Sequence, residues 1–293
     1  MQDEFHIKLK EILDDSLYVP KWVNTYAVKN KHVDILHDCF HVRIYKNGLN
    51  AAFVKKLKIL LTKLREMLNI THDRINIFLL LSGNKKRINV GETFTSENIN
   101  SGLSISNADP SAVHIVIYRL EDIFKVLIHE MLHYVGLDLR NTELSTIRSI
   151  DDMIKNKYKS MLHMDLHINE AYTEALALQY YCELMKKDFK LEQQHSIKQT
   201  KMFIRANRCD TLQSFQSKTD YQEKSHSFSY ILLKSALINC KYALNNIKIS
   251  SSDKGILCES FKRALLNNTW IRKVNEYKID KKQTKFNMNL IHV

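Results

Sequence analysis

The chain has 293 residues, of which 44% are hydrophobic, and it carries a formal net charge of +12. This apolar share is ordinary for a folded protein and excludes wholesale disorder, and the length suits one large domain or two smaller lobes. Six glycines and two prolines are too few for a sandwich or barrel built from many tight turns. Long helices joined by polar loops are therefore expected.

The first predicted elements are a helix, three strands and a second helix. Residues 51–69 have apolar positions at helical spacing and lysines on the other face, which predicts a surface helix. Residues 74–82 and 112–120 are short β-branched runs and are expected to form strands, with a less buried strand at a sheet edge over 98–106. A helix is predicted to begin at Glu121 and Asp122 and to run to about Leu132, and Gly136 suits its C-terminal cap.

The second half of the chain is predicted to be helical. A helix over 143–160 would turn five side chains inward: Leu144, Ile147, Ile150, Met153 and Tyr158. Four more are predicted, over 168–186, 194–206, 227–244 and 256–266. We therefore expect an α+β fold, in which a small mixed sheet and the 121–132 helix (residues 1–165) pack against a mostly helical lobe (166–293), with a cleft between the two lobes of one domain.

The cellular setting is predicted from the cysteines and the N-terminus. The five cysteines are scattered and never spaced as CxxC, which disfavours disulfides and thiolate zinc sites and favours a reducing compartment. The start of the chain has no signal-peptide core, and no apolar run approaches the roughly 20 residues of a membrane span. A cytoplasmic or otherwise intracellular protein without a membrane partner is expected; the oligomeric state stays open.

The positive charge raises the question of nucleic acid. The lysines are spread along the whole chain, with only a mild concentration in IRKVNEYKIDKKQTK near the C-terminus. Charge spread in this way is usually a solvated surface, so a nucleic-acid partner is not expected.

The stretch KVLIHEMLHYVGLD, residues 125–138, carries the first chemical motif. His129 and His133 are four apart and lie on one side of the predicted helix, so both imidazoles can reach one metal ion. Glu130 lies one residue round the helix, where it can face a metal-bound water. The pairs His37/His41 and His163/His167 have the same spacing but lack this glutamate. A glutamate on an otherwise apolar helix is costly to bury unless a cation lies beside it.

A zinc site of this kind needs a third protein ligand, and the sequence offers three candidates for it. A metzincin-like motif has glycine at Gly136 but would require histidine where Leu139 stands. His163 or His167 could serve, although no orienting carboxylate is evident for either. Glu170, in the stretch INEAYTEALA, is four residues before Glu174 on an alanine-rich helix; if Glu170 binds zinc and Glu174 accepts the N–H of a ligating histidine, both carboxylates are accounted for.

The two motifs together, HEMLH and NEAYTE, resemble those of the gluzincin zinc metallopeptidases, the thermolysin-like clan. The resemblance implies that His129, His133 and Glu170 bind Zn2+, that Glu130 is the catalytic base and that Glu174 is the carboxylate behind a ligand. It covers roughly residues 98–177, and the gap from His133 to Glu170 is longer than in thermolysin-like enzymes. The wider pattern is also similar to uncharacterised HExxH proteins of large DNA viruses, which would place the chain in a host cell or virion.

The expected activity is hydrolysis of peptide bonds in a protein or peptide substrate. Glu130 would take the proton of a zinc-activated water and pass it to the leaving amine. Gluzincins use a tyrosine or histidine to stabilise the transition state, and the resemblance points to His226 or Tyr230 in SHSFSYILLK. The stretch Asn100, Ser101 and Gly102 could pair with an extended substrate as an edge strand. The alternative is a catalytically silent, metal-binding structural or virion-associated protein of the same fold, for which a base beside the ligands has no use.

Overall fold

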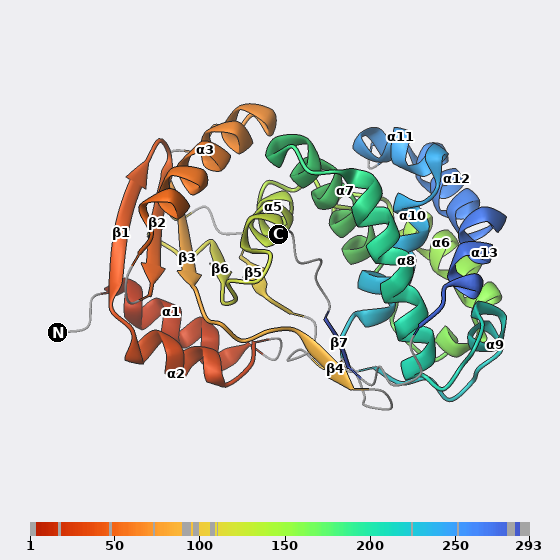
Figure 1. Cartoon of the computed structure of the whole chain (residues 1–293). Helices are drawn as coiled ribbons and strands as arrows, with labels where there is room; N and C mark the ends of the chain where they lie inside the picture. Colours follow the sequence, from red (N-terminus) through yellow and green to blue (C-terminus); the bar gives the residue numbers. More distant parts are fainter. Residues whose placement is uncertain are drawn as a thin grey trace. The chain divides into compact units, whose positions relative to one another are not determined.

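The computed structural model describes residues 4–16, 19–46, 49–72, 74–89, 95, 100–105, 109, 111–223, 225–250, 252–279 and 285–287. The chain forms two compact units that alternate along the sequence (Figure 1). The first contains residues 1–86, 100–135 and 180–187, and the second contains residues 87–99, 136–179 and 188–293. The domain boundary at residue 165 and the cleft stay predictions.

The first unit is built on a mixed five-stranded sheet, which confirms the α+β expectation. Its strands, in spatial order, are β1 (His32–His37), β2 (Phe40–Tyr45), β3 (Ile75–Leu80), β6 (Ile115–Ile117) and β5 (Gly102–Ser104). The three central strands β2, β3 and β6 run parallel, whereas β1 and β5 pair antiparallel with their neighbours. The sheet edge predicted over 98–106 is confirmed for β5, and residues 98, 99 and 106 lie outside the described residues.

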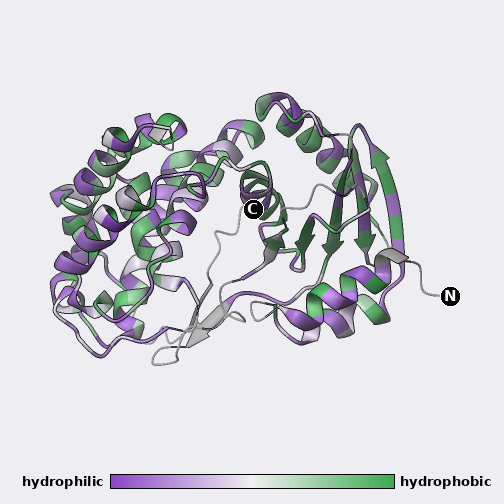
Figure 2. Ribbon diagram, turned by 180° about the vertical axis from the view of Figure 1, so that it is seen from behind, coloured by the Kyte–Doolittle hydropathy of each residue, from purple (hydrophilic) through white to green (hydrophobic). Residues whose placement is uncertain are grey.

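Helices cover the sheet, whose central strands are buried on both faces. Every residue of β2, β3 and β6 is buried, and the strands of the sheet are largely green, that is hydrophobic, in Figure 2. Helices α1 (Glu4–Asp15) and α2 (Trp22–Lys29) bury Leu9 and Val23 against Phe78, Leu80 and Val116. Helix α3 (Ala51–Met67) lies on the other side of the sheet in Figure 1 and buries four leucines: Leu57, Leu60, Leu61 and Leu64.

Helix α5 (Ile123–Tyr134) carries the HEMLH motif and is buried almost throughout. It contacts β5 and β6, and Glu130 lies beside Gly102 at the start of β5. Gly136, with φ of +74°, follows the C-cap Val135 in the left-handed conformation that glycine adopts without strain, as predicted.

The second unit is mostly helical. It contains α6 (Leu144–Lys157), the 3-10 turn η1 (Lys159–Met161), the first part of α7 (Ile168–Met185), α8 (Phe189–Ala206), α9 (Leu212–Gln216), the π-helix η2 (Phe228–Leu233), α10 (Lys234–Ile238), α11 (Lys241–Ser250), α12 (Lys254–Leu265) and α13 (Asn268–Glu276). Strands β4 (Arg87–Asn89) and β7 (Lys285–Asn287) form a separate antiparallel pair. Among the described residues, no helix is long and apolar enough to cross a membrane.

The structure corrects several boundaries. The helix predicted over 227–244 is interrupted, because Asn239 ends α10 and its carbonyl accepts a hydrogen bond from the Asn267 side chain at 2.9 Å. Helix α8 begins at Phe189 rather than at residue 194. The Asp188 side chain caps this start by accepting a hydrogen bond from the backbone amide of Lys190. Leu144 is 61% exposed and does not face inward as predicted; Thr146, Ile150 and Ile154 are the buried positions of α6.

Candidate metal site

The two histidines of α5 face each other one helical turn apart. Their Nε2 atoms are 3.1 Å apart, and both side chains are buried. Two nitrogens bound tetrahedrally to one zinc ion, each at about 2.0–2.1 Å, would lie about 3.3 Å apart. The observed separation suits either a hydrogen bond between two neutral rings or a pair of ligands that needs only a small adjustment.

Glu130 packs against another part of the first unit. Its side chain is buried on α5 and packs against Gly102 at the start of β5. A Cβ atom built on Gly102 would lie only 2.9 Å from Oε1 of Glu130 and 3.0 Å from its Cγ. Position 102 therefore admits no side chain without a shift of the glutamate, so the glycine is needed for this packing.

The strand segment that contains Gly102 is fixed by a buried arginine. Arg119 is 2% exposed, and its Nε donates to the carbonyl of Asn100 at 3.0 Å while Nη1 donates to the carbonyl of Asn84 at 3.2 Å. The amide of Tyr118 donates to the carbonyl of Ser101. These bonds hold the start of β5 beside Glu130.

Glu170 lies in the first turn of α7, in the second unit, and is half-buried. Its Oε2 accepts a hydrogen bond of 2.5 Å from the hydroxyl of Tyr230. This length is at the short end of the range for a hydroxyl bound to a carboxylate. The structure thus brings together Tyr230 and Glu170, a pairing that the sequence did not indicate.

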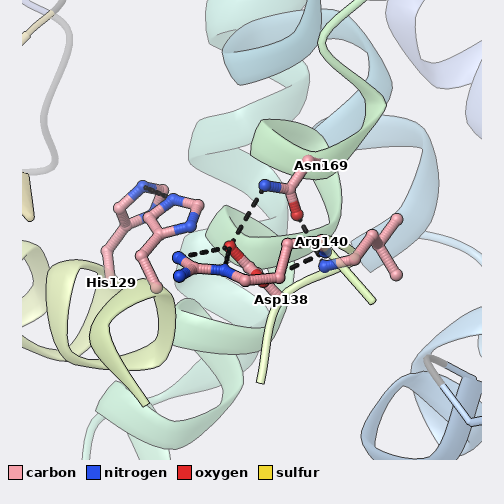
Figure 3. A network of polar contacts seen from close by, with 6 residues as sticks. His129, Asp138, Arg140 and Asn169 are labelled. Carbon is pink, nitrogen blue, oxygen red and sulfur yellow. Dashed lines mark hydrogen bonds and ion pairs between the residues drawn. The ribbon is translucent and has the colours of Figure 1, made fainter. Parts of the chain in front are cut away.

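A polar network fixes the chain just before Glu170 (Figure 3). The carboxylate of Asp138, which is buried, accepts from the Arg140 guanidinium at 2.9 Å and from the Asn169 amide at 3.2 Å. Oδ1 of Asn169 in turn accepts from the backbone amide of Leu139 at 2.7 Å. Asn169 adjoins Glu170, so these bonds orient the start of α7. The sequence alone does not indicate this role of Asp138.

His129, His133 and Glu170 form a group that could hold a metal ion. Each offers one ligand atom, and these atoms all lie within 4.8 Å of one another. Two imidazole nitrogens and one carboxylate oxygen are a donor set that zinc accepts, with a fourth position left for water. The residues present therefore fit such an ion, and the group includes Glu170 rather than His163 or His167.

Comparisons with known proteins add no family to this geometry. No protein-family model, curated protein or solved structure matches the chain. The resemblance of its two motifs to gluzincins therefore stays a prediction.

The remaining candidate histidines lie outside the group. His163 is exposed. The rings of His167 and His226 are in contact, with their centroids 3.4 Å apart and their planes tilted by 33°. Burial lowers the pKa of His226 to about 4, with a further lowering by His167, and burial also lowers the pKa of His167. Both rings are therefore neutral near pH 7, and a neutral imidazole can still donate one hydrogen bond.

Glu174 is buried on α7 one turn after Glu170, surrounded in sequence by other buried positions. Its role as the carboxylate behind a ligating histidine stays a prediction, and so does the role of His226 as a transition-state donor.

The role of Asn100, Ser101 and Gly102 as a substrate-binding strand also stays a prediction. The structure shows that these three residues lead into and begin β5, the last strand of the sheet.

Proposed function

We propose that the chain is a zinc-dependent metallopeptidase of the gluzincin type, with His129, His133 and Glu170 as zinc ligands and Glu130 as general base. The observation that carries the proposal is the set of three ligand atoms within 4.8 Å of one another, with a buried glutamate directly after the first histidine. A purely structural metal site has no use for a carboxylate at that position.

The chemistry follows from the residue types. When bound, zinc lowers the pKa of its water towards about 7 and polarises the carbonyl of the substrate. Glu130 would accept the proton of the attacking water and deliver it to the leaving amine. The packing of Glu130 against Gly102 limits the positions of the carboxylate, which favours proton transfer in one geometry.

The proposed substrate is a protein or peptide in an extended conformation. Strand β5 is the last strand of the sheet, and it begins at Gly102 beside Glu130. A peptide added to such an edge would bind mainly through its backbone, so its scissile bond would lie near the base whatever its side chains. This mode predicts broad sequence tolerance.

The first experiment measures zinc. The purified protein should bind about one zinc ion per chain, and His129→Ala, His133→Ala and Glu170→Ala should each lose most of it. His163→Ala is the matched control, because that histidine is exposed and lies outside the ligand group. Zinc retained in Glu170→Ala would mean that the third ligand is wrong.

The second experiment separates an enzyme from a metal-binding structural protein. Glu130→Gln should retain the zinc and the fold but lose hydrolysis of an unfolded protein substrate. A wild-type protein that binds zinc without hydrolysing any such substrate would favour the structural alternative. Normal turnover by Glu130→Gln would remove Glu130 as the base.

A further inference from the structure

Tyr230 contacts the carboxylate that the proposed function assigns to the metal. Its hydroxyl donates to Oε2 of Glu170 at 2.5 Å, and both residues belong to the second unit. A carboxylate has two oxygens, and this bond engages one of them. The bond restricts the rotation of the carboxylate and so limits the directions in which its oxygens can face a metal ion.

We propose that Tyr230 is a positioning residue for the third zinc ligand: its hydrogen bond to Oε2 fixes the orientation of the Glu170 carboxylate that would bind the metal. The proposal rests on the proposed function, because it presumes that Glu170 is a ligand. It differs from the transition-state role that the family resemblance suggested for Tyr230, because the hydroxyl proton is already used by Glu170. A tyrosine that stabilises the transition state would instead direct this proton at the substrate.

The backbone around Tyr230 is suited to holding a side chain in one place. Tyr230 lies in η2, a π-helix of six residues. Such wide turns are rare and occur often at functional sites. Its neighbours Ser229 and Ile231 are buried, whereas Tyr230 is partly exposed. The tyrosine is therefore the residue of this turn that reaches out of the core, on a backbone that the core holds rigid.

A half-buried carboxylate fixes the start of the same turn. Oε2 of Glu223 accepts from the amide of Phe228 at 2.9 Å, from the hydroxyl of Tyr221 at 2.7 Å and from the hydroxyl of Ser227. These three bonds bind the loop before η2 to its first residues. Glu223 thereby supports Tyr230 through the backbone, as Asn169 supports Glu170 from the other direction.

Zinc affinity tests this role directly. Partners behind a metal ligand typically contribute 10–100-fold to affinity or activity, so Tyr230→Phe should weaken zinc binding by at least about tenfold in competition with a chromophoric chelator. Turnover measured at saturating zinc should fall much less. Circular dichroism should show an unchanged fold, since the substitution removes one hydroxyl from a partly exposed side chain.

Tyr172→Phe is the matched control. Tyr172 lies on the same helix as Glu170, and its buried hydroxyl donates to the carbonyl of Ile247 at 2.6 Å rather than to the ligand. The control should lose stability without losing zinc affinity. Equal zinc loss in both variants would overturn the proposal, because it would show a general effect on α7.

The failures can be told apart. Wild-type zinc affinity in Tyr230→Phe together with a large fall in kcat would overturn the positioning role and restore the transition-state role. A wild-type protein that binds no zinc would overturn the proposed function itself, and the positioning role with it.

Discussion

An alanine at position 102 would place a methyl group against the proposed catalytic base. The Cβ atom would lie 2.9 Å from Oε1 of Glu130, 3.0 Å from its Cγ and 3.1 Å from the carbonyl oxygen of Val116. Ordinary van der Waals contact begins at 3.4 Å. The carbonyl of Val116 cannot easily retreat, because β6 pairs with a strand on each side. The glutamate therefore has to move by about half an ångström, a distance that matters where reacting groups must be aligned.

The size of the effect follows from that displacement. A misplacement of about 1 Å can cost about a hundredfold in rate, so half of it should cost about tenfold, or about 1.4 kcal/mol of transition-state stabilisation. The added methyl should also destabilise the fold by about 1–3 kcal/mol through overpacking. Zinc affinity should change little, because the proposed metal ligands are His129, His133 and Glu170 rather than Glu130.

The assay compares Gly102→Ala with Gly83→Ala. Gly83 belongs to the same unit, and nothing lies within 4 Å of a Cβ built there, so the control makes the same substitution without a collision. We would measure kcat/KM on an unfolded protein substrate, zinc affinity by chelator competition and the free energy of unfolding in urea. Equal turnover and equal stability in Gly102→Ala and Gly83→Ala would refute the collision between a side chain at position 102 and Glu130. It is also refuted if turnover falls only in proportion to lost zinc.

Three further predictions concern buried carboxylates and their partners. Glu174→Ala should weaken zinc binding about 10–100-fold and Glu174→Gln less, whereas a merely structural glutamate would leave the affinity measured by chelator competition unchanged. Asn169→Ala should cost about 1–3 kcal/mol in urea unfolding and also weaken zinc binding, because it leaves Asp138 short of a donor and frees the start of α7; wild-type values for both would contradict a role in orienting Glu170. Burial raises the pKa of Glu223, so the folded protein holds this proton more tightly than the unfolded chain. The protonated side chain therefore contributes to the free energy of unfolding below the pKa of the unfolded state, and this contribution is lost as pH rises through the pKa of the folded state. The stability of wild type relative to Glu223→Gln should therefore fall as pH rises from about 4, and thermal melts that show a constant difference from pH 4 to 7 would disprove the shift.

Much of the local structure follows from sequence alone. The apolar spacing of residues 51–69 and the β-branched runs over 74–82 and 112–120 correspond to α3, β3 and β6, because helix and strand periods leave different patterns. The HEMLH motif predicted its own helix and the facing histidines, since a separation of four residues sets their geometry whatever surrounds them. Gly136 as a cap follows in the same way, from the conformational freedom of glycine.

Contacts between distant residues could not be predicted in this way. The break of the 227–244 helix depends on Asn267, which binds the carbonyl of Asn239 from elsewhere in the chain. Helices α1 and α2 were not predicted, and only the structure shows that their apolar residues pack in one core with Phe78, Leu80 and Val116 of the sheet.

The candidate metal site also contains some features that the sequence predicts and others that only the tertiary structure shows. The sequence determined the histidine pair, because the five residues 129–133 of one helix contain all its geometry, and it indicated Glu170 through residue type. Tertiary structure decided that Glu170, rather than His163 or His167, joins the group. It also decided that Tyr230 binds this carboxylate, and that Glu130 packs where Gly102 has no side chain. These contacts join residues tens of positions apart, and no local period or propensity records which distant side chain will arrive at a given point in the fold.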